Sequence, residues 1–244
     1  MSERREAGPR VAAIVPAYNE EATLGLVLSV LKAAPAIDEI LVVSDGSTDG
    51  TVAIARAQGL RTIHLRENHG KGQAMAIGVA HTDAPILVFI DGDLMNLTVE
   101  LLDRLIAPVL SNRSDMNVGI RHRGRLLDAI HLYSGMLLSG IRCLRRNVFE
   151  AVPESHLKGF RIEIGLNWAC RQLGGCTTTF FLYGLEHLVK EKKRGLVRGS
   201  LARLEMLAAV LRAWLVLGAR PPALRQEVAG AAAALNFELE YINF

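Results

Sequence analysis

Ile86-Leu-Val-Phe-Ile-Asp-Gly-Asp93 is the stretch of this sequence that decides the fold. Apolar residues in an unbroken run, followed at once by two acids, are typical of a buried parallel strand with a polar carboxyl end. Ligands of parallel α/β sheets bind at that end. Asp91 and Asp93 repel one another unless a cation or a hydrogen-bonding ligand joins them, and Mg²⁺ or Mn²⁺ prefers such oxygens. The stretch therefore predicts a buried strand with a metal site at its end.

Strand and helix alternate in the same way through the residues before this stretch. Further strands are predicted at 11–15, 40–43 and 62–65, and helices at 24–31, 51–58, 72–80 and 101–110, with Asn19 as the N-cap of the first helix. This alternation predicts an α/β fold: a doubly wound, Rossmann-like, mostly parallel sheet with helices on both faces.

The residues beyond about 115 alternate less regularly. Strands are predicted there at 116–120 and 177–185, and helices at 126–138, 163–173, 201–217 and 229–234. No internal repeat or low-complexity linker divides the chain, so we expect a single domain over residues 1–244.

Composition narrows the class of protein. The net charge of +3 in 244 residues suits phosphorylated ligands if the positive charge is local. The cysteines are odd in number and form no CxxC pair, which indicates reduced thiols and argues against a zinc site. Residues 1–10 do not resemble a secretory signal, and charges interrupt the longest apolar stretch, 201–218, so we expect no membrane span and a cytoplasmic location.

The ends of the other strands exclude two common nucleotide-binding motifs. Pro16-Ala-Tyr-Asn-Glu-Glu21 follows the first strand in place of the GxGxxG of a dehydrogenase. Gly70-Lys-Gly72 lacks the earlier glycine and the following Ser or Thr of a P-loop. Ser44-Asp-Gly-Ser-Thr-Asp-Gly-Thr51 follows the second strand; Asp49 suits either a helix cap or a ligand contact, and Asp45 can accept hydrogen bonds from a base or ribose.

Four segments in this order resemble the GT-A glycosyltransferases of family 2. They are PAYNEE at 16–21, SDGSTDGT at 44–51, ENHGKGQA at 67–74 and FIDGDL at 89–94. Residues 139–146, residues 158–165 and Glu186-His187 add a looser similarity to small soluble bacterial members, to polyprenyl-phosphate sugar transferases and, in part, to glucosyl-3-phosphoglycerate synthases. The resemblance implies a nucleotide-sugar-binding half at about 10–115 and an acceptor-side half at about 116–244.

The resemblance also implies a role for each matching residue. Asp93 would ligate Mg²⁺ or Mn²⁺ together with His187, and Glu163 would face the acceptor as a general base. A phosphate acceptor would need no base, and a pairing of Glu163 with Lys158 or Arg161 is the plainer alternative. The remaining implied contacts to the nucleotide sugar are Pro16, Ala17, Tyr18, Glu20, Asp45, Lys71, Asp91 and Gly92.

Two departures from the family pattern bear on this site. Ser44 stands where many relatives have an acid, so one nucleotide contact is lost or changed. Polyprenyl-phosphate transferases often have a metal-binding Gln soon after the two acids, whereas Leu94, Met95 and Asn96 follow Asp93 here. The thioether of Met95 is a poor Mg²⁺ ligand. The second departure argues against a lipid-phosphate acceptor and gives His187 more weight as a ligand.

Basic residues gather at 121–125, 142–146 and 190–198. Such clusters are either solvated faces or sites for a phosphate, a carboxylate or an anionic membrane, and they lack the interleaved aromatics of nucleic-acid binders. We therefore expect metal-dependent transfer from a UDP- or GDP-sugar to a phosphorylated or hydroxyl acceptor, such as phosphoglycerate or a lipid phosphate. A nucleotidyltransferase and a non-catalytic nucleotide-sugar-binding protein are the alternatives; peripheral membrane contact and a homodimer stay open.

Overall fold

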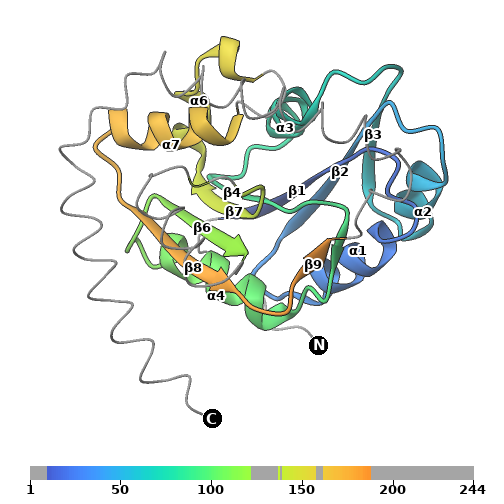
Figure 1. The fold of residues 1–244 in the computed structure, drawn as a ribbon, viewed down its shortest axis with the longest axis horizontal. Coiled ribbons are helices and arrows are strands. Elements are labelled where there is room, and N and C mark those ends of the chain that lie inside the picture. The colour runs from blue at the N-terminus through green and yellow to red at the C-terminus, as the bar shows by residue number, and fades with distance from the viewer. Residues whose placement is uncertain (1–9, 122–136, 138, 158–161, 188–244) are drawn as a thin grey trace, which may run out of the picture.

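A computed structural model of the chain describes residues 10–121, 137, 139–157 and 162–187. Their centre is a seven-stranded sheet in the order β3-β2-β1-β4-β7-β6-β8, with a separate two-stranded sheet of β5 and β9 (Figure 1). The elements of the first half are β1 (Val11–Ala17), α1 (Leu24–Ala33), β2 (Glu39–Asp45), α2 (Thr51–Ala57), β3 (Arg61–Leu65), α3 (Lys71–Ala80) and β4 (Ile86–Phe89).

Strands β1 to β4 are parallel to one another, as their apolar runs predict. The elements that follow are β5 (Leu94–Met95), α4 (Val99–Leu110), β6 (Met116–Arg121), β7 (Arg142–Arg145), α6 (Arg146–Glu150), the 3₁₀ helix η1 (Glu154–His156), α7 (Ile162–Gln172), β8 (Thr177–Leu182) and β9 (Glu186–His187). Strand β7 runs antiparallel to both β4 and β6, whereas β6 and β8 are parallel, so the sheet is mostly parallel.

Both faces of the sheet are covered by helices, which confirms the predicted α/β layers. Alternate residues of β1 show the two sides: Val11, Ala13 and Val15 pack with α1 and α4, whereas Ile14 packs with α3 and α7. In Figure 1 the helices α3, α6 and α7 lie on one side of the sheet, and α1 and α4 lie on the other.

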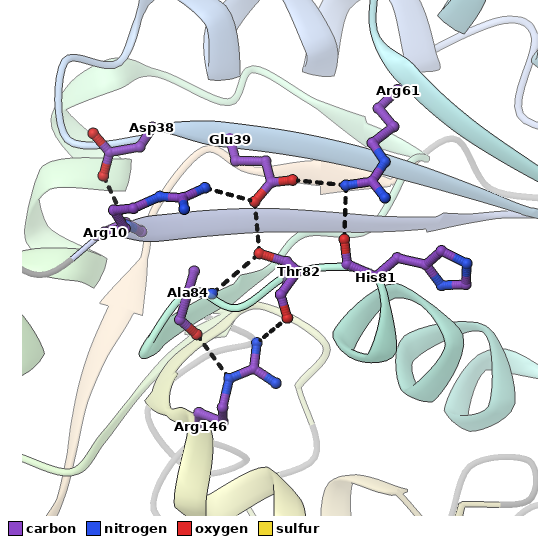
Figure 2. A network of polar contacts seen from close by, with 9 residues as sticks. Arg10, Asp38, Glu39, Arg61, His81, Thr82, Ala84 and Arg146 are labelled. Carbon is purple, nitrogen blue, oxygen red and sulfur yellow. Dashed lines mark hydrogen bonds and ion pairs between the residues drawn. The ribbon is translucent and has the colours of Figure 1, made fainter.

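The amino ends of the strands are closed by a polar network (Figure 2). Glu39 accepts hydrogen bonds from Arg10 at 3.4 Å, Arg61 at 3.1 Å and the Thr82 hydroxyl at 2.6 Å. Arg146 reaches the same region from the other side and donates to the carbonyls of Ala84 at 3.0 Å and Thr82 at 2.5 Å. This edge is held together by internal contacts, and the polar motifs lie at the opposite edge.

The structure adds one strand, corrects two expectations about local structure and leaves three expected helices outside the described residues. Strand β7 was not predicted, because its arginines hide the buried Cys143 and Leu144. The strand expected at 177–185 ends at Leu182, since Gly184 turns the chain with a φ of 71°. The N-cap of α1 is Thr23 rather than Asn19. The helices expected at 126–138, 201–217 and 229–234 lie outside the description, apart from Leu137, which is not helical.

In the ranges given above, no helix has the length and apolar character needed to cross a bilayer.

Candidate active site

The carboxyl ends of β1, β2 and β4 bring the polar motifs of the sequence to one edge of the sheet. The first two of these motifs are tied to each other by hydrogen bonds. Asn19, which has a φ of 54°, accepts from the backbone of Thr48 at 2.9 Å and donates its own N–H to Ser47 at 3.1 Å. Glu21 accepts from the backbone of Gly50 at 2.8 Å. The two loops therefore form one braced rim.

Asp49 also belongs to this brace. Its carboxylate accepts from the backbone N–H groups of Thr51 at 3.0 Å and Glu21 at 3.2 Å. Burial raises the pKa of Asp49, but the hydrogen bonds from Thr51 and Glu21 together lower it by more. The pKa of Asp49 therefore lies below its usual value. The N-cap of α2 is Gly50 rather than Asp49, which lies one residue earlier and bonds the first backbone N–H of the helix.

Asp45 organises the loop after β3. The residue is buried, and its two carboxylate oxygens accept from the backbones of His69 and Gly70, each at 2.8 Å. Gly70 is the N-cap position of α3, so these bonds fix the start of that helix and place Lys71 as its first residue. A contact between Asp45 and a nucleotide base stays a prediction.

Lys71 lies between two carboxylates from opposite halves of the chain. Its Nζ is 2.5 Å from Oδ1 of Asp91, just after β4, and 3.6 Å from Oε1 of Glu163 in α7. All three side chains are largely buried, with 22% of Lys71, 20% of Asp91 and 13% of Glu163 exposed. The structure thus brings three predicted site residues together, and it gives Glu163 an ion-pair partner that the sequence did not suggest.

The charge of Lys71 is stabilised in this setting. Burial lowers the pKa of Lys71, but Asp91, Glu163 and the more distant Asp93 together raise it above its usual value. Lys71 is therefore a permanent cation at neutral pH. It offsets part of the negative charge of the three acids before any ligand binds.

Gly140 packs directly on this ion pair. A Cβ at Gly140 would collide with Nζ of Lys71 and with both carboxylate oxygens of Asp91. The backbone next to Gly140 is held in place by Arg142, a fully buried residue of β7, whose Nε donates to the carbonyl of Ser139 at 2.7 Å. Sequence reasoning gave neither Gly140 nor Arg142 a role, although the family resemblance at 139–146 marked the segment.

Asp93 and His187 come together at the level of the backbone. Strand β5 begins directly after Asp93 and pairs antiparallel with β9, in a register that sets Leu94 opposite His187. Among the side chains that the structure describes, which do not include that of His187, no three His, Cys, Asp or Glu residues gather as a metal site. Metal ligation by Asp93 and His187 stays a prediction, and the strand pairing is compatible with it.

The residues predicted to line the nucleotide differ in exposure. Tyr18 is 39% exposed, whereas Ala17, Glu20 and Gly92 are buried and Pro16 is partly buried. The Gly92 carbonyl accepts from the hydroxyl of Thr23 at 2.8 Å. Ser44, the first departure from the family pattern, is buried against Nδ1 of His64 at 3.2 Å. Tyr18 is therefore the member of this set with the most accessible side chain.

The basic cluster at 142–146 is not a ligand surface, which corrects one of the readings left open by the sequence. Arg142 is buried, Arg145 pairs with Asp115 at 3.1 Å, and Arg146 bonds the amino edge of the sheet as in Figure 2. Each guanidinium is committed to contacts within the fold. The clusters at 122–125 and 190–198 lie outside the described residues, and the side chain of Arg121 is not described.

Comparison with known proteins agrees with this geometry. Residues 12–151 match the profile of the family described as Glycosyl transferase family 2. Glucosyl-3-phosphoglycerate synthase of Mycobacterium tuberculosis (strain CDC 1551 / Oshkosh) is 31% identical over 172 residues, which are 67% of this chain and 52% of that protein. The undecaprenyl-phosphate 4-deoxy-4-formamido-L-arabinose transferase of Shewanella sediminis is 27% identical over 187 residues, 66% of this chain and 56% of that protein.

Solved structures of the mycobacterial synthase share the fold. The crystal structure of the Mycobacterium tuberculosis enzyme with Mn²⁺, UDP-glucose and phosphoglyceric acid has a TM-score of 0.70 at 25% identity, and the match covers 84% of this chain and 80% of that one. Another, with Mg²⁺ and UDP, has a TM-score of 0.71 at 26% identity and covers 88% and 82%. The chain spans about half the length of the curated relatives described above. The profile match, the shared fold and the carboxylates at the end of β4 together place the chain in glycosyl transferase family 2.

Proposed function

We propose that this protein is a metal-dependent glycosyltransferase that transfers a sugar from a UDP- or GDP-sugar to a phosphorylated or hydroxyl acceptor. The observation that carries the proposal is the Lys71 ion pair at the end of β4, which joins Asp91 of the donor motif to Glu163 of the acceptor half. The solved relatives bind UDP-glucose and phosphoglyceric acid with Mn²⁺, which supports the same class of donor and acceptor here.

The residues at this edge fit a divalent cation. Lys71 holds Asp91, so we assign the cation to Asp93, with His187 contributing from β9 because its backbone lies opposite Leu94. Carboxylate oxygen and imidazole nitrogen both suit Mn²⁺, and diphosphate oxygens commonly fill the other positions of such sites. When bound, Mg²⁺ or Mn²⁺ would stabilise the negative charge of the leaving nucleoside diphosphate.

The residues of the chain have separate roles in this proposal. The braced rim formed by the loops at 16–21 and 44–51 holds the base and ribose, with Tyr18 as its accessible side chain. Asp91, fixed by Lys71, binds the ribose or sugar. Glu163 accepts the proton of a hydroxyl acceptor. An ionised phosphate acceptor needs no base.

An acceptor and donor screen tests the proposal. The protein is incubated with Mn²⁺ and either UDP-glucose or GDP-mannose, together with 3-phosphoglycerate, glycerol 3-phosphate or a short polyprenyl phosphate, and products are identified by mass spectrometry. We expect a glycosylated product and release of the nucleoside diphosphate with one pair. Release of glucose 1-phosphate or mannose 1-phosphate with a nucleotidylated acceptor would instead indicate a nucleotidyltransferase. Tight binding of UDP or GDP without any product would indicate a binding protein.

A further inference from the structure

Arg142 is a buried cation that no substrate can reach. Arg142 lies in β7, opposite Phe89 of β4, and its side chain is fully buried. Phe89 is two residues before Asp91 in the sequence. Because a buried guanidinium is costly to desolvate, an apolar side chain would fill this position more cheaply. What a guanidinium adds is a rigid set of donors that can bind several segments at once.

The donors of Arg142 bind segments on two sides of the site. Nε donates to the carbonyl of Ser139 at 2.7 Å, and Nη2 donates to the carbonyl of Leu137. Nη1 donates to Oδ1 of Asn167 at 2.7 Å. Asn167 is buried in α7, and its own amide donates to the Leu137 carbonyl at 3.4 Å. A single guanidinium therefore ties the chain before β7 to helix α7.

Both tied segments touch the Lys71 ion pair. Gly140 follows the bonded residues Leu137 and Ser139 and precedes Arg142 in the sequence. It packs on Lys71 and Asp91 so closely that there is no room for a Cβ. Glu163 lies one helical turn before Asn167, so the two project from the same face of α7, Glu163 toward Lys71 and Asn167 toward Arg142. Burial lowers the pKa of Arg142 to about 10, against the opposing effect of Glu163 and Asp91, and the guanidinium stays charged at neutral pH.

We propose that Arg142 is a positioning residue for sugar transfer: its guanidinium fixes Gly140 against Asp91 and fixes α7 so that Glu163 faces the acceptor. This inference rests on the proposed function. It assigns to Arg142 and Asn167 the alignment of the two halves of the site, and it leaves the binding of the nucleotide to the rim on β1 and β2. Misplacement of reacting groups by about 1 Å can reduce turnover roughly 100-fold, so small shifts of α7 suffice.

The test compares Arg142→Lys and Asn167→Ala with two matched controls. Arg142→Lys keeps the charge and loses the rigid fork, and Asn167→Ala removes the bond to α7 while keeping Arg142. The controls are Arg145→Lys, in the same strand but paired with Asp115, and Asn117→Ala, a buried asparagine that bonds α4. Turnover is measured with the donor and acceptor pair found by the screen, and UDP affinity by calorimetry with Mn²⁺.

We expect kcat to fall roughly 10- to 100-fold in both test variants, with UDP affinity within about twofold of wild type and both controls near wild-type turnover. Wild-type turnover in Arg142→Lys would overturn the proposal, because charge alone would then suffice. Equal losses in the controls would also overturn it, because they would show a general effect on stability.

Amide hydrogen exchange provides a second test, an arm of the experiment that does not depend on catalytic activity. Peptides covering 139–145 and 162–167 should exchange faster in Arg142→Lys and Asn167→Ala than in the wild type, while peptides in β1 and β2 do not change. Unchanged exchange in both peptides would overturn the tether. If no donor and acceptor pair reacts with the wild type, the proposed function fails, and this arm still decides whether Arg142 holds the two segments together.

Discussion

At the scale of single residues, the site depends on how a few buried charges are paired. Lys71 offsets Asp91 and Glu163 within the fold, which supports the proposed assignment of the metal to Asp93. The contact of Glu163 with the acceptor stays a prediction. Tyr18 and Asp45 differ in exposure: the side chain of Tyr18 is accessible to a ligand, whereas Asp45 is buried and holds the loop before α3.

The first prediction concerns Asp93. Asp93→Ala should abolish sugar transfer, by at least about 100-fold, because the metal loses its main protein ligand and the leaving group loses its charge stabilisation. Circular dichroism should show an intact fold. The control is Asp103→Ala, an exposed acid on α4. Substantial turnover in a folded Asp93→Ala protein would rule out the metal assignment.

The second prediction concerns His187. His187→Ala should weaken transfer and reduce the advantage of Mn²⁺ over Mg²⁺, because Mn²⁺ accepts imidazole nitrogen more readily than Mg²⁺ does. Rates are compared with each ion at saturating donor. If the variant keeps full activity with both ions, His187 has a structural role and the late part of the family resemblance does not extend to the metal.

The third prediction concerns Gly140. Gly140→Ala should reduce turnover strongly and destabilise the protein by about 1–3 kcal/mol, because the new methyl group must displace Lys71 or Asp91. Gly25→Ala, in α1 with only ordinary contacts near its Cβ, is the control and should be neutral or stabilising. Urea unfolding and turnover are measured on both variants; equal behaviour would show that the ion pair tolerates a shift.

At the scale of elements, loops after parallel strands create the site, and hydrogen bonds between loops make it rigid. The loops after β1 and β2 bond each other through Asn19, Glu21 and Asp49, and the loop after β3 is bound by Asp45. Helices α3 and α7 then approach one another, since Gly72 of α3 packs closely against Ile162, the first residue of α7, and against the Leu157 carbonyl after η1.

The fourth prediction follows from the lowered pKa of Asp49. A carboxylate whose folded pKa lies below its unfolded value stabilises the fold above the unfolded pKa, about 3.9, and this contribution is lost as pH falls through the folded pKa. The difference in unfolding free energy between wild type and Asp49→Ala should therefore be largest near pH 6 and shrink below about pH 4. Denaturant titrations at several pH values measure it; a difference that grows in acid would contradict the assigned hydrogen bonds.

At the scale of the whole molecule, the sequence predicted the layers and the gathering of the polar motifs at one edge of the sheet, and it failed where charged residues are buried. Apolar runs such as 86–90 identified β1 to β4, and polar strand ends identified Asp91 and Asp93. Strand β7 was hidden because Arg142, Arg145 and Arg146 read as a solvated cluster. Each of them also has a partner far away in the sequence, at Asn167, Asp115 or Thr82, and no local sequence pattern predicts such pairings.

The remaining link across the molecule, between Lys71 and Glu163, could not be predicted for the same reason. The two residues are 92 positions apart and meet only because β7 inserts antiparallel between β4 and β6, and α7 then crosses the same face of the sheet as α3. Periodicity gives elements and their faces, whereas the contacts between elements depend on the order of the strands.

The measurement that tests the central claim most directly is a calorimetric titration of the protein with UDP and with GDP, in Mn²⁺ and again in EDTA. If the edge at Asp91 and Asp93 is a metal-dependent nucleotide site, one of the two nucleotides should bind at least about tenfold more tightly with Mn²⁺, because unneutralised phosphates would face the carboxylates. Equal affinity in both buffers, or no binding of either nucleotide, would contradict the account.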